Sequence, residues 1–251
     1  MKKILCILLT IIMLIGLCSC SYTLLPSDVR GSVNIPGDDK DTTNVPVDVQ
    51  NTLDTSDDVQ DTTDNSAEDT ESLDFSMGTS SSGVYTNDFL GLSFTAPEGW
   101  VFYTDKQILE LNNVVSEFYD EDTLEALKNA TIVYDMYATY EDGMQSVNIN
   151  MEKLSSFEIM SFDVKESLES QIGALKTSYE NMGYTDVDVK YQKITVDGKE
   201  FDALTLSANL YGYSASVVVF SFIRGNYMAN VAAFSFYSGG VEEILKCFTV
   251  K

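Results

Sequence analysis

Two runs near the end of the sequence, residues 217–220 and 231–234, are apolar at every position. Because side chains alternate along a β-strand, such a run is buried on both faces and belongs at the centre of a covered sheet. The runs fall within a series of strands predicted at 187–196, 201–209, 213–223 and 227–236. Turn signals such as Asp197-Gly198 separate these strands. We therefore expect a meander in a central, mostly antiparallel sheet with helices on each face.

Two earlier strands are predicted at 131–140 and 146–154, joined by a turn at Glu141-Asp142-Gly143. The second strand alternates strictly. One face carries Val147, Ile149 and Met151, and the other carries Ser146, Asn148 and Asn150. A period of two residues is typical of a strand whose two faces meet different surroundings.

Capping signals and apolar spacing predict four helices. Thr104 with Gln107 forms a capping box, and a shorter helix covers 123–129. The longest helix starts at Asp163 and Glu166 and ends at Gly183, and a final helix covers 241–248. The predicted class is α+β, an α/β/α sandwich with a central, mostly antiparallel sheet flanked by helices.

The predicted order of elements is β-β-α-β-β-α-β-β-β-β-α. With the segment Leu90-Gly91-Leu92-Ser93-Phe94, the turn Pro97-Glu98-Gly99-Trp100 and the ending at 242–248, it resembles the PsbP-like family. That family includes the photosystem oxygen-evolving subunit, the Mog-type Ran-binding proteins and many bacterial lipoproteins. The resemblance covers residues 85–251. It implies a PsbP-like domain that works as a binding or assembly module and not as an enzyme.

The first residues indicate export. Lys2 and Lys3 precede an apolar run at 4–17, and Leu17-Cys18-Ser19-Cys20 follows. This stretch resembles the lipobox of bacterial lipoproteins, in which the signal is cut before an acylated cysteine. We expect a signal peptide at 1–19 and lipidation of Cys20, which anchors the chain to the cell membrane on the extracytoplasmic side. A plain secretory signal and a spanning helix are the alternatives, but the run is short of the roughly 20 residues that a span needs.

Residues 20–83 predict a lipid-anchored, disordered acidic linker. Between residues 21 and 83, fourteen acidic residues stand against Arg30 and Lys40, and aromatic residues are nearly absent. A segment of low hydrophobicity and one charge sign cannot bury enough apolar surface to offset its ordering entropy. The folded domain is expected at 84–251.

Composition excludes several functions. The chain has no histidine and a formal net charge of −24, which argues against histidine-dependent catalysis and against nucleic-acid binding. Of its four cysteines, Cys247 alone stays as a free thiol once Cys6 and Cys18 leave with the signal and Cys20 is acylated. No metal-ligand spacing, phosphate loop or cofactor motif appears. We expect no catalytic residue, metal ion or cofactor.

Several side chains have both a functional and a structural interpretation. Trp100 is expected to anchor the core and Cys247 to be buried and inert. On a regular strand Tyr137 faces away from Tyr134 and Tyr140, so the three tyrosines form no shared platform.

Two pairs of carboxylates also have both a functional and a structural interpretation. Asp120 and Asp122 stand where helix caps are needed. Asp135 and Glu152 lie on neighbouring strands of unknown register.

These observations predict a membrane-anchored lipoprotein whose domain is a non-catalytic protein-binding or assembly module, with an unidentified envelope protein as its partner. The alternative is a small-ligand or glycan-binding surface receptor, which needs a pocket between sheet and helix. The sequence assigns no ligand-binding residue.

Overall fold

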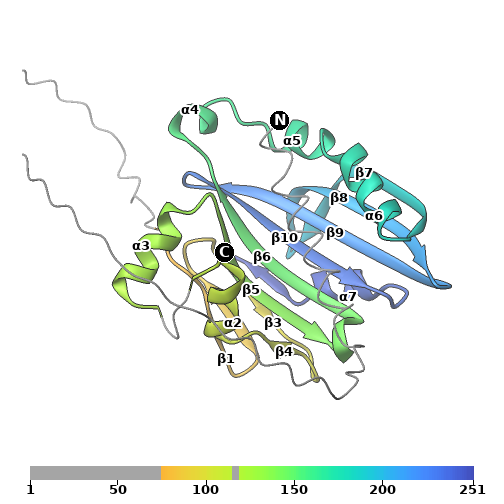
Figure 1. Cartoon of the computed structure of the whole chain (residues 1–251), viewed down its shortest axis with the longest axis horizontal. Helices are drawn as coiled ribbons and strands as arrows, with labels where there is room; N and C mark the ends of the chain where they lie inside the picture. The colour runs from red at the N-terminus through yellow and green to blue at the C-terminus, as the bar shows by residue number, and fades with distance from the viewer. Residues whose placement is uncertain (1–74, 115–118) are drawn as a thin grey trace, which may run out of the picture. The chain divides into compact units, whose positions relative to one another are not determined.

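The structure is a computed structural model that describes residues 75–114 and 119–251 (Figure 1). The expected signal peptide, the acylation site Cys20 and most of the expected linker lie outside the described residues. Within the described ranges, no helix is long and apolar enough to cross a membrane.

The described strands form two antiparallel sheets. The smaller has the order β1-β2-β3-β11, and the larger has the order β4-β5-β6-β10-β9-β8-β7. The small sheet contains β1 (Thr79–Ser81), β2 (Val84–Asn87), β3 (Leu92–Thr95) and β11 (Phe248–Val250). The large sheet contains β4 (Val101–Phe102), β5 (Ile132–Tyr140), β6 (Gln145–Lys153), β7 (Thr185–Val196), β8 (Lys199–Leu210), β9 (Tyr213–Arg224) and β10 (Tyr227–Ser235).

The described helices are short. They are α2 (Asp105–Leu111), α3 (Glu121–Asn129), α4 (Ser156–Ile159), α5 (Val164–Glu169), α6 (Ile172–Asn181) and α7 (Gly240–Leu245), with a 3₁₀ turn η1 (Glu141–Gly143). The capping box at Thr104 and Gln107 is confirmed at the start of α2. Asp120 caps α3 by accepting a hydrogen bond from the Thr123 amide.

The predicted meander β7-β8-β9-β10 is confirmed, and β10 pairs with β6 on its other side. All nine residues of β10 are buried, as the doubly apolar runs predicted. The turn at Asp197-Gly198 is confirmed, and both of its residues have positive φ.

The two faces of the large sheet have different covers. On the first, which we call the small-sheet face, Val147, Ile149 and Met151 of β6 pack in one core with Phe94 of the small sheet and Val241 of α7. On the second, the helix face, a separate core joins the sheet to α5 and α6, which lie across it in Figure 1. Helices on both faces confirm the predicted α+β class.

The small sheet was not predicted, and it corrects the end of the expected final helix. Helix α7 ends at Leu245, and Phe248 begins strand β11 instead of continuing the helix. The Phe248 ring packs on Phe94 of β3 with 4.9 Å between ring centroids. The apolar residues at 241–248 therefore belong to two elements, the helix α7 and the strand β11.

The predicted long helix is broken. Asp163 caps α5 as expected, but the chain leaves the helix at Ser170 and Gln171 before α6 begins at Ile172. Gln171 is buried at this break, and its side-chain amide donates to the Ser167 carbonyl at 3.0 Å. The end at Gly183, which has a φ of 91°, is confirmed.

The described part of the chain starts at Phe75, within the stretch expected to be linker. Phe75 stacks on Tyr227 with a centroid distance of 4.9 Å, and β1 pairs with β2. The acidic composition of the stretch predicted a linker, so the packing of Phe75 and the polar edge strand β1 were not expected.

A β-bulge in β5 changes which side chains share a face. The register shifts between Tyr134 and Met136, so that Asp135 is an extra residue. Tyr134 stands opposite Asn150 and Tyr137 opposite Asn148, which places both tyrosines on the helix face. The prediction that Tyr137 faces away from Tyr134 is therefore wrong, because it assumed a regular strand, whereas Tyr140, opposite Gln145, faces away from Tyr137 as expected.

Candidate functional site

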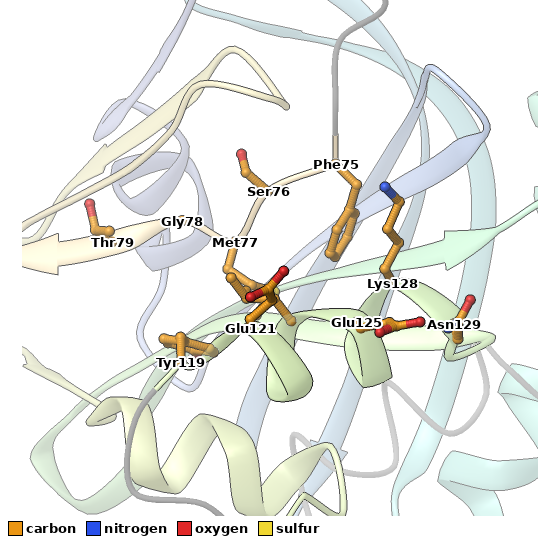
Figure 2. Close-up of a pocket in the computed structure, with 11 residues that line it drawn as sticks. Phe75, Ser76, Met77, Gly78, Thr79, Tyr119, Glu121, Glu125, Lys128 and Asn129 are labelled. Carbon is orange, nitrogen blue, oxygen red and sulfur yellow. The ribbon is translucent and has the colours of Figure 1, made fainter.

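A surface groove of about 690 Å³ lies between α3 and the segment that leads into β1 (Figure 2). In Figure 2 the Ser76 and Thr79 side chains point away from α3, while Lys128 extends from α3 toward Phe75. The residues that line the groove are Phe75, Ser76, Met77, Gly78, Thr79, Tyr119, Glu121, Leu124, Glu125, Lys128 and Asn129.

The segment 75–79 is a fixed wall of this groove. The Gly78 amide donates to Oδ1 of Asp135 at 2.7 Å, and Nδ2 of Asn87 donates to the Ser76 carbonyl at 3.2 Å. A Cβ atom at Gly78 would lie 2.3 Å from Cε2 of Tyr85, so only glycine allows this close approach. Side chains from two different sheets therefore hold the wall.

Asp135 is the polar centre behind the wall. Its carboxylate accepts hydrogen bonds from the Tyr85 hydroxyl and from Nδ2 of Asn87, the latter at 2.6 Å, in addition to the Gly78 amide. Burial raises the pKa of the Asp135 carboxyl, and these hydrogen bonds oppose the rise. Burial and the neighbouring carboxylate raise the pKa of Tyr85 well above its ordinary value. Asp135 does not line the groove, so its role there is structural.

The opposite wall is α3, whose position is fixed by its C-terminal end. The Lys128 carbonyl accepts a hydrogen bond from the Tyr227 hydroxyl at 3.3 Å and from Nζ of Lys153 at 2.7 Å. Leu127 is buried in the core, while Leu124 is 38% exposed in the groove. Helix α3 therefore has one anchored side and one side open to a ligand.

The groove combines apolar groups with two acidic side chains and one basic side chain, Lys128. Met77, Tyr119 and Leu124 give it apolar surface, and Glu121 and Glu125 are exposed along α3. Burial, followed by the charges of Asp105 and Asp135, raises the pKa of Tyr119, so its hydroxyl stays protonated at neutral pH and can donate a hydrogen bond.

The groove opens beside a sheet edge. Among the described strands β1 pairs with β2 alone, and all three residues of β1 are exposed. An edge strand of this kind presents backbone N–H and C=O groups that an added strand can pair with.

Two other hollows lie elsewhere on the described surface. One, of about 640 Å³, lies beside α4, where Phe157 is 83% exposed. The other, of about 520 Å³, lies between α7 and β7–β9 and is lined largely by polar side chains of the sheet. Neither is backed by a buried hydrogen-bonded carboxylate like Asp135.

The structure separates the carboxylates that the sequence left as possible pairs. Asp120 is a helix cap, and its hydrogen bonds with Thr123 lower its pKa. Asp122 lies in the first turn of α3. Asp135 binds the small sheet, whereas Glu152 lies opposite Met228 on the helix face. These carboxylates form no joint site.

The remaining candidates are packing residues. Trp100 is partly buried against the core and stacks on Tyr140 with 6.2 Å between centroids. Cys247 is half-buried, and burial followed by the charge of Glu243 raises its thiol pKa. Within residues 75–114 and 119–251, no group of three acidic or cysteine side chains is placed to hold a metal ion.

Sequence reasoning missed the groove because its wall lies in the stretch assigned to the linker. Phe75 and Gly78 were the available signals, since an aromatic residue is out of place in an acidic spacer. The three donors to Asp135, at positions 78, 85 and 87, are about fifty residues away from it in the chain, and no local pattern connects them with it.

Comparison with known proteins adds little. No family model and no curated protein matches the chain. Among solved structures it is similar to the Saccharomyces cerevisiae Ran-binding protein Mog1p, with 12% sequence identity, a TM-score of 0.31, and coverage of 64% of this chain and 90% of that chain. At this identity and TM-score the similarity carries no functional inference. The fold and groove themselves define an α+β domain with an open site at a sheet edge.

Proposed function

We propose that this domain is a non-catalytic protein-binding module that accepts an extended segment of a partner in the groove between α3 and residues 75–79. The observation that carries the proposal is the groove itself, which has one wall held by hydrogen bonds and includes Thr79 of β1, a strand whose outer edge is not paired with any described strand. Extended segments bind to such edges through backbone hydrogen bonds, and adjacent pockets for side chains supply specificity.

The groove also favours a particular partner chemistry. Its apolar surface suits an apolar anchor, and the exposed carboxylates of Glu121 and Glu125 suit a basic residue beside it. The formal net charge of −24 further favours a basic partner through long-range attraction. We expect an envelope protein with an extended segment that alternates apolar and basic side chains.

A photo-crosslinking residue tests this site. With p-benzoylphenylalanine at Leu124 of the full chain in intact cells, we expect a discrete protein adduct. Tyr211, which is 93% exposed outside the groove, is the matched control and should give no such adduct. Charge reversal at both Glu121→Lys and Glu125→Lys should reduce the Leu124 adduct several-fold. No adduct at Leu124, or equal adducts at both positions, would overturn the proposal.

The location of the module rests on the sequence. We propose a lipoprotein with a signal at 1–19, acylation at Cys20 and a disordered linker that carries the domain away from the outer side of the membrane. Two acyl chains on one cysteine are enough for stable anchoring. Cys20→Ala should abolish labelling by radioactive palmitate and move the protein out of the membrane fraction. Cys18→Ala should leave both unchanged, and loss of label in that variant would show that the wrong cysteine was assigned.

The second candidate function, a small-ligand receptor, draws support from a different region. The helix face of the large sheet carries buried polar side chains that have no hydrogen-bond partner among the described residues. These groups play no part in the groove.

A further inference from the structure

The two walls of the groove between α3 and residues 75–79 run in opposite directions. At one end the Tyr227 hydroxyl donates to the Lys128 carbonyl at 3.3 Å, and the ring of the same tyrosine stacks on Phe75. The C-terminal end of α3 therefore lies beside the start of the wall. Figure 2 shows the Lys128 side chain extending from α3 toward Phe75 at this end.

The other end of the groove is located by Asp135. Its carboxylate accepts a hydrogen bond from the Gly78 amide at 2.7 Å, and its charge contributes to the raised pKa of the Tyr119 hydroxyl. Tyr119 directly precedes Asp120, the N-cap of α3. The N-terminal end of α3 therefore lies beside Gly78, where the wall leads into β1, as Figure 2 also shows.

The charged side chains of the groove are sorted along its length. Glu121 lies in the first turn of α3 and Glu125 one turn later, whereas Lys128 lies in the last turn. All three are exposed, and Leu124, also exposed, lies between the two ends. From Glu121 to Lys128 the helix rises about 10 Å. An extended chain covers this distance in roughly three to four residues.

The small sheet indicates the direction in which a partner strand adds. Its described pairings, β1 with β2, β2 with β3 and β3 with β11, are all antiparallel. A segment that pairs with the outer edge of β1 keeps this pattern when it runs antiparallel to β1. Because the wall leads directly into β1, such a segment passes Glu121 first and Lys128 afterwards.

We propose that the groove selects the charge order of its partner, which is basic-x-apolar-x-acidic from the N-terminus, where x faces away from α3. This inference rests on the proposed function, since it assumes that an extended segment occupies the groove. The basic side chain lies beside Glu121, the apolar one beside Leu124 and the acidic one beside Lys128. A spacing of two residues places all three side chains on one face of the segment. The reverse order brings like charges together at both ends, which is unfavourable.

Two peptides of identical composition test the charge order on the full-length protein in detergent micelles. The first, Thr-Lys-Thr-Leu-Thr-Glu-Thr with a neutral fluorophore at its N-terminus and an amide at its C-terminus, has the proposed order. The second exchanges the lysine and the glutamate. By fluorescence anisotropy at low salt we expect the first peptide to bind about fivefold more tightly, because two exposed ion pairs replace two like-charge contacts. The preference should shrink at high salt, which screens exposed charges.

Exchanging the charges of the groove gives a sharper test. The double variant Glu121→Lys with Lys128→Glu keeps the net charge and should prefer the second peptide. Lys128 holds α3 through its backbone carbonyl, so the exchange leaves those hydrogen bonds in place. Lys128→Gln is the milder second variant and should reduce the preference to about twofold. Lys176→Glu, at an exposed position of α6 outside the groove, is the matched control and should keep the full preference.

The outcomes separate this inference from the proposed function. Equal binding of the two peptides, tighter binding of the second peptide to the wild type, or an unchanged preference in the double variant would overturn the charge order alone. The groove would then still be a site for extended segments. If neither peptide binds at millimolar concentration, the groove does not accept such segments, and both the charge order and the proposed function are wrong.

Discussion

The two faces of the large sheet differ in whether a buried polar side chain is hydrogen-bonded. On the small-sheet face a single carboxyl, Asp135, is enclosed by three hydrogen-bond donors. On the helix face the amide of Asn148 is equally buried, and neither its nitrogen nor its oxygen has a hydrogen-bond partner within residues 75–114 and 119–251.

The difference separates a polar group that joins two sheets from one that makes no hydrogen bond among the described residues. Asp135 connects β5 to the small sheet and to the wall of the groove, so its hydrogen bonds offset the cost of burying a carboxyl group. Asn148 connects nothing in the described structure and only costs stability. The comparison predicts that removing these two side chains changes stability in opposite directions.

The largest effect is expected at Asp135. Asp135→Ala leaves the Tyr85 hydroxyl, Nδ2 of Asn87 and the Gly78 amide without this acceptor. We expect a loss of about 4 kcal/mol in the free energy of unfolding. Urea unfolding followed by the fluorescence of Trp100 measures it. Asp122→Ala, at an exposed position in α3, should change stability by about 0.5 kcal/mol at most, and a similar loss in both variants would contradict the account.

The next effect concerns the wall of the groove. Gly78→Ala places a methyl group against the fully buried ring of Tyr85 and should destabilise the domain by about 2 kcal/mol. The same variant should reduce the crosslink at Leu124, because the wall shifts. Gly173→Ala is the matched control: it lies in α6 with open space around its Cβ position, and should stabilise by about 0.5 kcal/mol. Unaltered stability in Gly78→Ala would show that the wall is not held as described.

Titration of Asp135 should make the free energy of unfolding depend on pH. Its pKa is raised in the folded state, so the folded protein binds the proton more tightly than the unfolded chain. The contribution to stability is full below the ordinary pKa of an aspartate and is lost as the pH rises through the folded value. As the pH falls from 7 toward 4, the free energy of unfolding of the wild type should therefore increase relative to that of Asp135→Asn, by up to about 1.4 kcal/mol per pH unit. Urea midpoints across this range test it, and a constant difference would contradict the raised pKa.

Much of the fold followed from local patterns. The alternation in β6, the doubly apolar runs in β9 and β10 and the turn at Asp197-Gly198 located the large sheet. The sequence did not predict the small sheet, because β1 is a polar edge strand and β11 is only three residues long. The PsbP-like resemblance stays a prediction.

The sites were harder to predict for a physical reason. Asp135 takes its donors from residues 78, 85 and 87, and only the fold brings these together. The position of Tyr137 depends on a bulge that no spacing in β5 reveals. Ser146, Asn148 and Asn150 were recognisable as one face of a strand, but the alternation did not predict that this polar face is buried as well.

The most direct test is the stability of Asn148→Val in the ligand-free protein. The substitution removes a buried amide without partners and adds a side chain suited to a strand. We predict a gain of about 1 kcal/mol in the free energy of unfolding, whereas Ile149→Ala, one residue along on the small-sheet face, should lose about 3 kcal/mol. A loss of 1 kcal/mol or more in Asn148→Val would contradict the account, because it would show that this amide already stabilises the domain without a ligand.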